Sequence, residues 1–152
     1  LFNHPVAMAF KSGDEEYDFT IKGRNEIEEA EAEAEEAEMR SLVEGIKAGR
    51  LKSKTPDGYL VLAGEFYDAI EAGKKTVEYR DFTEYNIKRT IGLKTVRFNL
   101  GYGSKGKPPK QMQWEVKGVV LMDGDENECD PYNVPEDFWP VTIALLLGKR
   151  IG

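Results

Sequence analysis

The sequence contains few of the residues that build disulfides, zinc sites and histidine-dependent catalytic pairs. Its 152 residues include one cysteine, Cys129, and one histidine, His4. A single cysteine excludes an internal disulfide, and a single histidine leaves little for a zinc site or for a Ser–His or Cys–His pair. We therefore expect a protein without a bound metal or cofactor, in a reducing compartment.

Long apolar segments are missing as well. The most apolar stretch, about residues 141–147, is far shorter than the roughly 18–20 residues that a membrane span needs. The chain also begins without the basic and apolar regions of a secretory signal. With 40% hydrophobic residues it still has enough apolar mass for a packed core. We expect a cytoplasmic protein that has no membrane partner.

The net charge of −7 is unevenly distributed along the chain. The first 50 residues account for all of it, and the positive and negative charges of the remaining residues balance. Residues 72–120 hold eleven Lys or Arg against four acids, which are Glu78, Asp81, Glu84 and Glu115. This local excess of +7 predicts a surface that attracts polyanions, although the whole chain is acidic.

Residues 1–57 are predicted to be an N-terminal extension that precedes the main domain. Residues 5–22 have the pattern of a short hairpin, with its second strand over residues 17–22. Asn25 can then cap an Ala- and Glu-rich helix over residues 26–48. The outward positions of this helix are mostly acidic, so we expect a solvated helix. A protein-binding helix and a mimic of nucleic-acid charge are the alternatives.

A polar segment with a Pro56-Asp57-Gly58 turn separates this extension from a second domain, residues 58–152. There, short strands and two short helices, the first with Phe66 and Ile70 on one face, follow one another without a regular strand–helix–strand alternation. This order favours an α+β fold, a small β-barrel with short flanking helices, over a doubly wound sheet. Strands are predicted at residues 59–63, 76–80, 94–99 and 112–121, and at residues 141–147, where the apolar run is also compatible with a helix. Helices are predicted at residues 65–72 and from a cap at Thr83 to about residue 89.

The segment from Gly73 to Arg80 carries a lysine, a glutamate and an arginine at short spacing. Glu78 and Arg80 are two residues apart, so they share a face on a regular strand. Lys75 follows the end of the preceding helix, where the helix dipole favours a cation. Near one cleft, the three groups can bind an anion, polarise a carbonyl or take part in acid–base catalysis. The alternative is an ion pair that only orders the strand.

A second basic segment is the glycine-rich loop of residues 101–110. Its G-x-G-x-x-G spacing matches a dinucleotide fingerprint, but the Pro108-Pro109 pair prevents the helix that such a site requires. The loop can instead follow a phosphate backbone with Lys105 and Lys107, and Tyr102 is available for stacking. The alternative is a solvated hairpin loop whose lysines only keep it soluble.

Residues from about 59 to 152 resemble an ASCH domain, a member of the PUA-like β-barrel superfamily, in the form found in small phage and bacterial proteins. The diagnostic pattern of that family, G-x-K-x-x-E-x-R, occurs here at Gly73, Lys75, Glu78 and Arg80. The further pieces that match in order and spacing are residues 66–70, Tyr85, Lys88, Arg89, Phe98, Asn99, Gly101, Tyr102 and residues 147–151.

The resemblance implies a barrel whose cleft lies beside the first short helix and is lined by the motif residues. It also implies that this cleft binds RNA or a modified nucleotide. For such a ligand we expect Arg80 to contact phosphate or a base edge and Glu78 to accept hydrogen bonds from an exocyclic amine. We expect Tyr79 or Tyr102 to stack on a base and basic side chains to follow the backbone. The residues that contact the nucleic acid are then Lys75, Glu78, Arg80, Arg89, Tyr102, Lys105 and Lys107.

A hydrolase is the second hypothesis. One branch of the family is similar to an amidohydrolase that removes the acyl group from acetylated cytidine with a lysine, a threonine and a glutamate, and other members resemble ribonucleases. Lys75 occupies the lysine position of that branch, and Glu78 stands at the threonine position. Glu115, on the later strand, is the candidate counterpart of the glutamate. The catalytic residues are then Lys75, Glu78 and Glu115.

A third hypothesis is a protein-interaction function, in which the acidic helix of residues 26–48 binds a partner protein. The charge of this helix is opposite in sign to that of residues 72–120. The helix can therefore also cover the basic cleft of its own chain and inhibit binding there.

Overall fold

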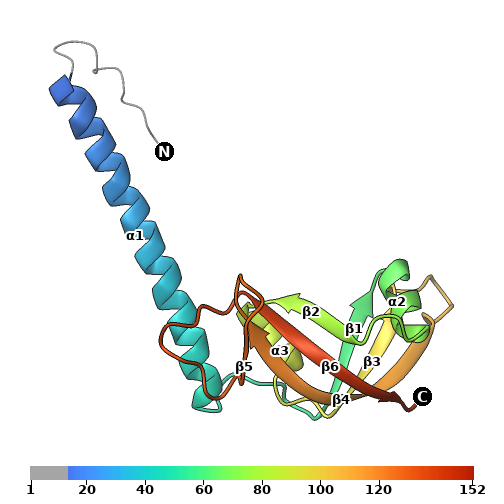
Figure 1. Cartoon of the computed structure of the whole chain (residues 1–152). Coiled ribbons are helices and arrows are strands. Elements are labelled where there is room, and N and C mark those ends of the chain that lie inside the picture. The colour runs from blue at the N-terminus through green and yellow to red at the C-terminus, as the bar shows by residue number, and fades with distance from the viewer. Residues whose placement is uncertain (1–13) are drawn as a thin grey trace. The chain divides into compact units, whose positions relative to one another are not determined.

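The computed structural model describes residues 14–152, which form an α+β fold (Figure 1). Each strand and helix expected after residue 58 is present, and a short strand, β5, is added in the acidic loop after β4. The helices are α1 (Asp14–Lys47), α2 (Gly64–Glu71) and α3 (Glu84–Thr90). The strands are β1 (Asp57–Leu62), β2 (Val77–Asp81), β3 (Thr95–Leu100), β4 (Gln111–Met122), β5 (Glu128–Cys129) and β6 (Thr142–Arg150).

α1 begins earlier than expected, and the hairpin predicted over residues 5–22 is wrong in its second half. Residues 17–22 are helical, and the first predicted strand lies outside the described residues. The Ala- and Glu-rich segment extends its helix backwards, because adding a residue to an existing helix costs far less than starting one. No proline lies between Pro5 and Pro56 to stop this extension, and Asn25 lies inside α1 rather than at its start.

The chain divides after residue 40 into two compact units. In the first unit the side chains of residues 24–38 are exposed, so this acidic part of α1 is solvated. In the second unit Ile46, near the end of α1, is fully buried in a hydrophobic cluster that includes Ile87 of α3 and Ile143 of β6. The second unit therefore includes residues that precede the boundary expected at residue 58.

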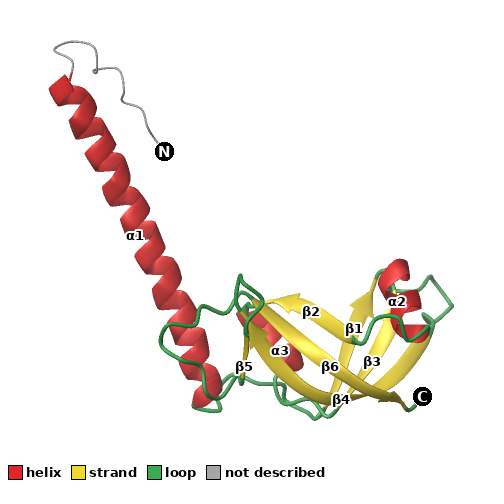
Figure 2. Cartoon of the chain, viewed as in Figure 1, coloured by secondary structure: helices red, strands yellow, loops and turns green. Residues whose placement is uncertain are grey.

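Five strands form one mixed sheet in the order β1, β3, β4, β6 and β2, and β5 pairs with the C-terminal end of β4. β1 and β3 are parallel, and the other neighbours are antiparallel. The sheet curls into a half-barrel with β1 and β2 at its two edges (Figure 2). This architecture agrees with the predicted small barrel, while its assignment to the PUA-like superfamily stays a prediction.

The larger hydrophobic cluster lies between the sheet and α2. Its side chains alternate along the strands, as expected for one buried face of a sheet. Tyr67 and Ile70 of α2 are fully buried in it. The remaining buried members come from β1, β3, β4, β6 and the segment before β3: Leu60, Leu62, Leu93, Val96, Phe98, Met112, Val116, Leu145 and Leu147.

Gly58 in β1 has no room for a side chain, because a Cβ at that position would overlap the buried side chain of Leu93. We expect Gly58→Ala to lower the free energy of unfolding by about 1–3 kcal/mol through overpacking, measured by urea denaturation. Gly118→Ala in β4 is the matched control. A Cβ at Gly118 would meet no other atom within contact distance, so the free energy of unfolding should change by no more than about 0.5 kcal/mol. If the two variants were equally stable, the close contact between Gly58 of β1 and Leu93 would be contradicted.

Candidate functional site

The candidate site lies where β2 forms an edge of the half-barrel, directly after α2. Gly73 follows α2 with a φ of 77°, a conformation that glycine adopts at low cost. The chain then passes through Lys75 into β2, where side chains alternate between the two sides of the strand. Glu78 and Arg80 are in direct contact, which confirms that they share a face as predicted.

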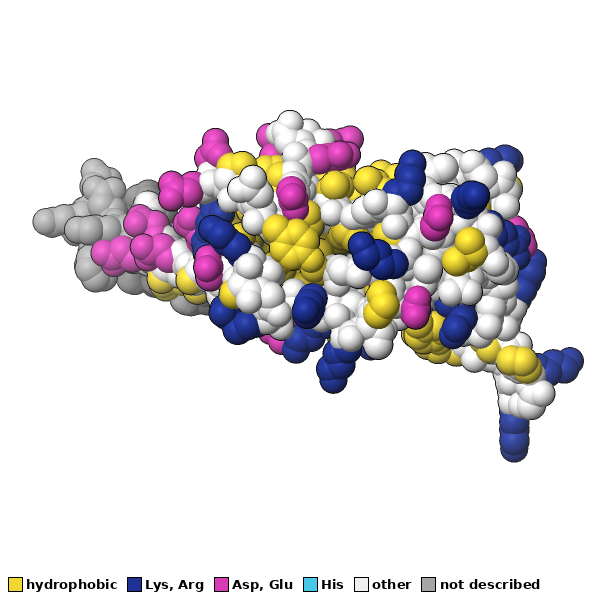
Figure 3. Space-filling model, turned by 90° about the horizontal axis from the view of Figure 1, so that it is seen from below, with side chains coloured by type: hydrophobic (Ala, Val, Ile, Leu, Met, Phe, Trp, Pro, Cys, Tyr) yellow, Lys and Arg dark blue, Asp and Glu magenta, His cyan; other side chains and the backbone are white. Residues whose placement is uncertain are grey.

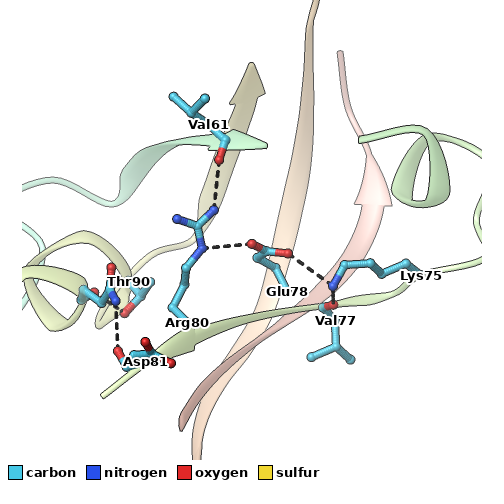
Figure 4. A network of polar contacts seen from close by, with 8 residues as sticks. Val61, Lys75, Val77, Glu78, Arg80, Asp81 and Thr90 are labelled. Carbon is cyan, nitrogen blue, oxygen red and sulfur yellow. Dashed lines mark hydrogen bonds and ion pairs between the residues drawn. The ribbon is translucent and has the colours of Figure 1, made fainter. Parts of the chain in front are cut away.

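Glu78 is the centre of a polar network between two cations (Figure 4). The residue is buried, with 6% of its surface exposed. Its Oε1 lies 3.2 Å from Nζ of Lys75, and its Oε2 accepts a hydrogen bond of 2.9 Å from Nε of Arg80. Burying a carboxylate is unfavourable unless it is paired, so the two cations stabilise the buried charge.

Arg80 also connects the two edges of the sheet. Its Nη2 donates a hydrogen bond of 3.1 Å to the carbonyl of Val61 on β1 (Figure 4). β1 and β2 are the two ends of the strand order, and in the described part of the chain they do not pair with each other. The guanidinium therefore links the edges where strand pairing is absent, and Glu78 holds it in the required orientation.

Side chains also bind backbone carbonyls at both ends of β2. Nζ of Lys75 donates a hydrogen bond of 2.6 Å to the carbonyl of Val77, and Nδ2 of Asn86 donates one of 3.0 Å to that of Asp81. Asn86 lies close to β2 because it is in the first turn of α3, and the N-cap of α3, Thr83, follows the end of β2 by two residues. The Thr83 side chain accepts a hydrogen bond from the Asn86 N–H, as the predicted cap requires. These contacts fix β2 without a neighbouring strand on that edge.

The two cations retain donors that the network does not use. A lysine has three N–H donors and an arginine has five. The contacts above take up two of them on Lys75 and two on Arg80. The two side chains are 21% and 24% exposed. The network is therefore a fixed pair of partly exposed cations with one surplus positive charge, which suits an anionic ligand.

Two aromatic rings flank the ammonium of Lys75. Its Nζ lies 5.6 Å from the ring centroid of Phe66 on α2 and 5.2 Å from that of Tyr79 on β2, within cation–π range. On α2, Ile70 and Tyr67 are fully buried, whereas Phe66, four residues before Ile70, is 47% exposed. The sequence does signal an exposed ring on this helix: Phe66 and Tyr67 are adjacent, and neighbours on a helix point in different directions, so both rings cannot face the core.

The other residues predicted to contact nucleic acid lie outside this network. Arg89 on α3 stacks on Tyr85, with its guanidinium carbon 4.2 Å from the ring centroid. Tyr102, Lys105 and Lys107 are exposed in the loop between β3 and β4. Among the described residues, no hydrogen bond or ion pair joins these side chains to the network. Their part in binding stays a prediction.

Glu115 contacts the backbone of β6. Its Oε1 accepts a hydrogen bond of 3.2 Å from the N–H of Lys149, close to an irregularity in the pairing of β4 with β6. A Cβ at Gly148 would lie 2.6 Å from the same carboxylate oxygen, so the glycine permits this approach. The contact orders the bulged pairing. In the described part of the chain, no hydrogen bond or ion pair links Glu115 to Lys75, and its catalytic role stays a prediction.

A second charged cluster fixes α2 on the barrel. Glu71 of α2 accepts hydrogen bonds from Lys110, at 3.1 Å, and from Arg150, at 3.4 Å. The hydrogen bond from Lys110 lowers the pKa of Glu71, and the same bond raises the pKa of Lys110. Burial raises the pKa of the neighbouring Tyr67 phenol. Because α2 is attached in this way, the position of Phe66 on its exposed side is defined.

Comparison with known proteins gives no match: no family model, no curated protein and no solved structure matches the chain. The resemblance to the ASCH family therefore stays a prediction. Among the side chains that the structure describes, those of residues 23–152, no group of three or more His, Cys, Asp or Glu is arranged to hold a metal ion. In the same part of the chain, no helix combines the length and the apolar character needed to cross a membrane.

Glu78 and Glu84 provide a matched pair of lysine-bound carboxylates, one buried and one exposed. We expect Glu78→Gln to lower the free energy of unfolding by about 2 kcal/mol, because it removes charge-assisted bonds in a buried setting. Glu84, 2.9 Å from Lys88, is more than half exposed, so Glu84→Gln should cost at most about 0.5 kcal/mol. Urea denaturation measures both. An equal, small effect would show that the network contributes no more than a surface ion pair.

The thiol of Cys129 is half-buried, and burial raises its pKa. A raised pKa reduces the thiolate fraction at neutral pH, and the thiolate is the reactive form. We therefore expect iodoacetamide to alkylate Cys129 in the folded protein more slowly than in the urea-unfolded protein at pH 7.5. A faster reaction in the folded state would indicate an activated thiol and would contradict this environment.

Proposed function

We propose that the chain binds RNA or a modified nucleotide at the surface that contains Lys75 and Arg80. The observation that carries this proposal is the buried carboxylate of Glu78, which holds two partly exposed cations in fixed positions. Cations that are already ordered lose less conformational entropy when they bind an anion. The phosphate groups of a nucleotide are anions that accept hydrogen bonds from both lysine and arginine.

The charge of the surrounding surface supports the same ligand. Residues 72–120, which contain β2, α3, β3 and most of β4, carry the local excess of +7. Figure 3 shows one face of the molecule, on which Lys, Arg, Asp, Glu and hydrophobic side chains are interspersed. Basic and aromatic side chains meet directly in the pairs Lys75–Tyr79 and Arg89–Tyr85. Basic and aromatic groups side by side are typical of surfaces that bind single-stranded nucleic acid.

The roles of the individual residues follow from their contacts. Arg80 has unused N–H donors for a phosphate or a base edge, and Lys75 has one. Glu78 has both oxygens bound to these cations, so its role is to position them rather than to accept a hydrogen bond from a base. Outside the network, we assign Arg89, Lys105, Lys107 and Tyr102 to the nucleotides that flank the bound one.

The contacts of the two candidate catalytic carboxylates favour binding over hydrolysis. Glu78 is fixed between two cations, and Glu115 accepts a backbone hydrogen bond that orders the pairing of β4 with β6. In the described part of the chain, neither carboxylate has a hydrogen bond to a hydroxyl or thiol that it could activate as a nucleophile. Hydrolysis of an acylated nucleoside is therefore the alternative outcome of the test below.

Lys75→Gln tests the proposal, because it removes one cation and leaves the bond between Arg80 and Glu78 intact. We expect the variant to bind a fluorescent single-stranded RNA of six uridines about tenfold more weakly, measured by fluorescence anisotropy. The slope of log K against log salt should fall by about 0.7, the value for one lost phosphate contact on a single strand. Lys54→Gln, at an exposed lysine before β1, is the matched control and should bind as the wild type does.

Two results would contradict the proposal. The first is wild-type affinity that does not change between low and high salt, and the second is equal affinity of the Lys75→Gln variant and the wild type. Chromatography of acetylated cytidine and of the RNA after incubation tests the alternative. Conversion of either one, lost in Lys75→Gln and kept in Lys54→Gln, would support an enzyme.

A further inference from the structure

The rings of Phe66 and Tyr79 converge on one ammonium from two different elements. Nζ of Lys75 lies 5.6 Å from the first ring centroid and 5.2 Å from the second. α2 carries Phe66, and β2, the next element of the chain, carries Tyr79. The loop between the two elements brings the ammonium of Lys75 within cation–π range of both rings, so the three side chains are neighbours on the surface.

Both rings are held against Lys75 and are still open to solvent. Phe66 is 47% exposed and Tyr79 is 52% exposed. Single exposed aromatic residues are common on protein surfaces and need no explanation. Two rings that contact the same cation are not isolated in this way. The ammonium covers part of each ring, and the rest of each ring remains accessible to a planar group such as a base.

Lys75 and the helix that carries Phe66 are both held in place by contacts with the rest of the fold. Lys75 is fixed by its contacts with the carbonyl of Val77 and with Glu78. Phe66 lies on α2, which is attached to the barrel by Glu71 and by the buried Tyr67. A stacking surface on fixed elements loses little entropy when a base binds to it.

We infer that Phe66 and Tyr79 are a two-ring platform for single-stranded RNA: one base stacks on each ring, and Lys75 between them binds the phosphate that joins the two nucleotides. This inference rests on the proposed function and adds the form of its ligand. Bases in a duplex are already stacked on their neighbours, so the platform selects unpaired bases. Because the platform contacts the flat faces of the bases, which all four bases have, it binds RNA of different sequences.

Phe66→Leu and Tyr79→Leu test the platform while they keep an apolar side chain. We expect each variant to bind the six-uridine RNA about tenfold more weakly, because one stacked base is lost. Phe66→Tyr and Tyr79→Phe keep the rings and should bind within about twofold of the wild type, which separates stacking from damage to the fold. Tyr132→Leu is the control of similar exposure, at 49%, and should bind normally.

A duplex of the same length completes the test, and it should bind at least tenfold more weakly than the single strand. Wild-type affinity in both leucine variants, or equal affinity for duplex and single strand, would overturn the platform. If Lys75→Gln still weakens binding in that case, the proposed function stands without the platform. If neither Lys75→Gln nor the leucine variants weaken binding, both the platform and the proposed function fail.

Discussion

The buried carboxylate of Glu78 is the constraint on which the rest of the site depends. A carboxylate with 6% of its residue exposed needs compensating charge, and Lys75 and Arg80 supply it from two sides. Meeting this requirement fixes both cations. Arg80 is thereby oriented to donate to Val61 across the open side of the half-barrel. The contacts of one residue, Glu78, thus hold both cations in position, and one of these cations links the two unpaired edges of the sheet.

The same arrangement is the reason why we propose binding rather than catalysis. Preorganised cations lower the entropic cost of binding an anion. A carboxylate that accepts a hydrogen bond from Arg80 and forms an ion pair with Lys75 is committed to positioning these two cations. The acidic part of α1, residues 24–38, has exposed side chains. A protein partner for that helix, and its inhibition of the basic surface, stay hypotheses.

Much of the second unit follows from the sequence, because its periodic patterns and turn residues are local. The spacing of Glu78 and Arg80 predicts that they share a face, and the position of Thr83 before a helical pattern predicts a cap. The contact of Arg80 with Val61 joins residues 19 positions apart, and depends on a strand order that no local pattern encodes. The choice between Phe66 and Tyr67 as the buried ring likewise depends on how α2 meets the sheet. Residues 17–22 alternate like a strand, but the neighbouring helix extends through them.

The most direct test of this account is the Nε–H signal of Arg80 in a ¹H–¹⁵N NMR spectrum. The hydrogen bond to Glu78 predicts a slowly exchanging signal in the free protein, and ligand binding predicts that it shifts on titration with single-stranded RNA. A signal that exchanges as fast as that of free arginine would show that Glu78 does not hold the guanidinium. A protected signal that stays unchanged at saturating RNA would show that the ligand binds elsewhere.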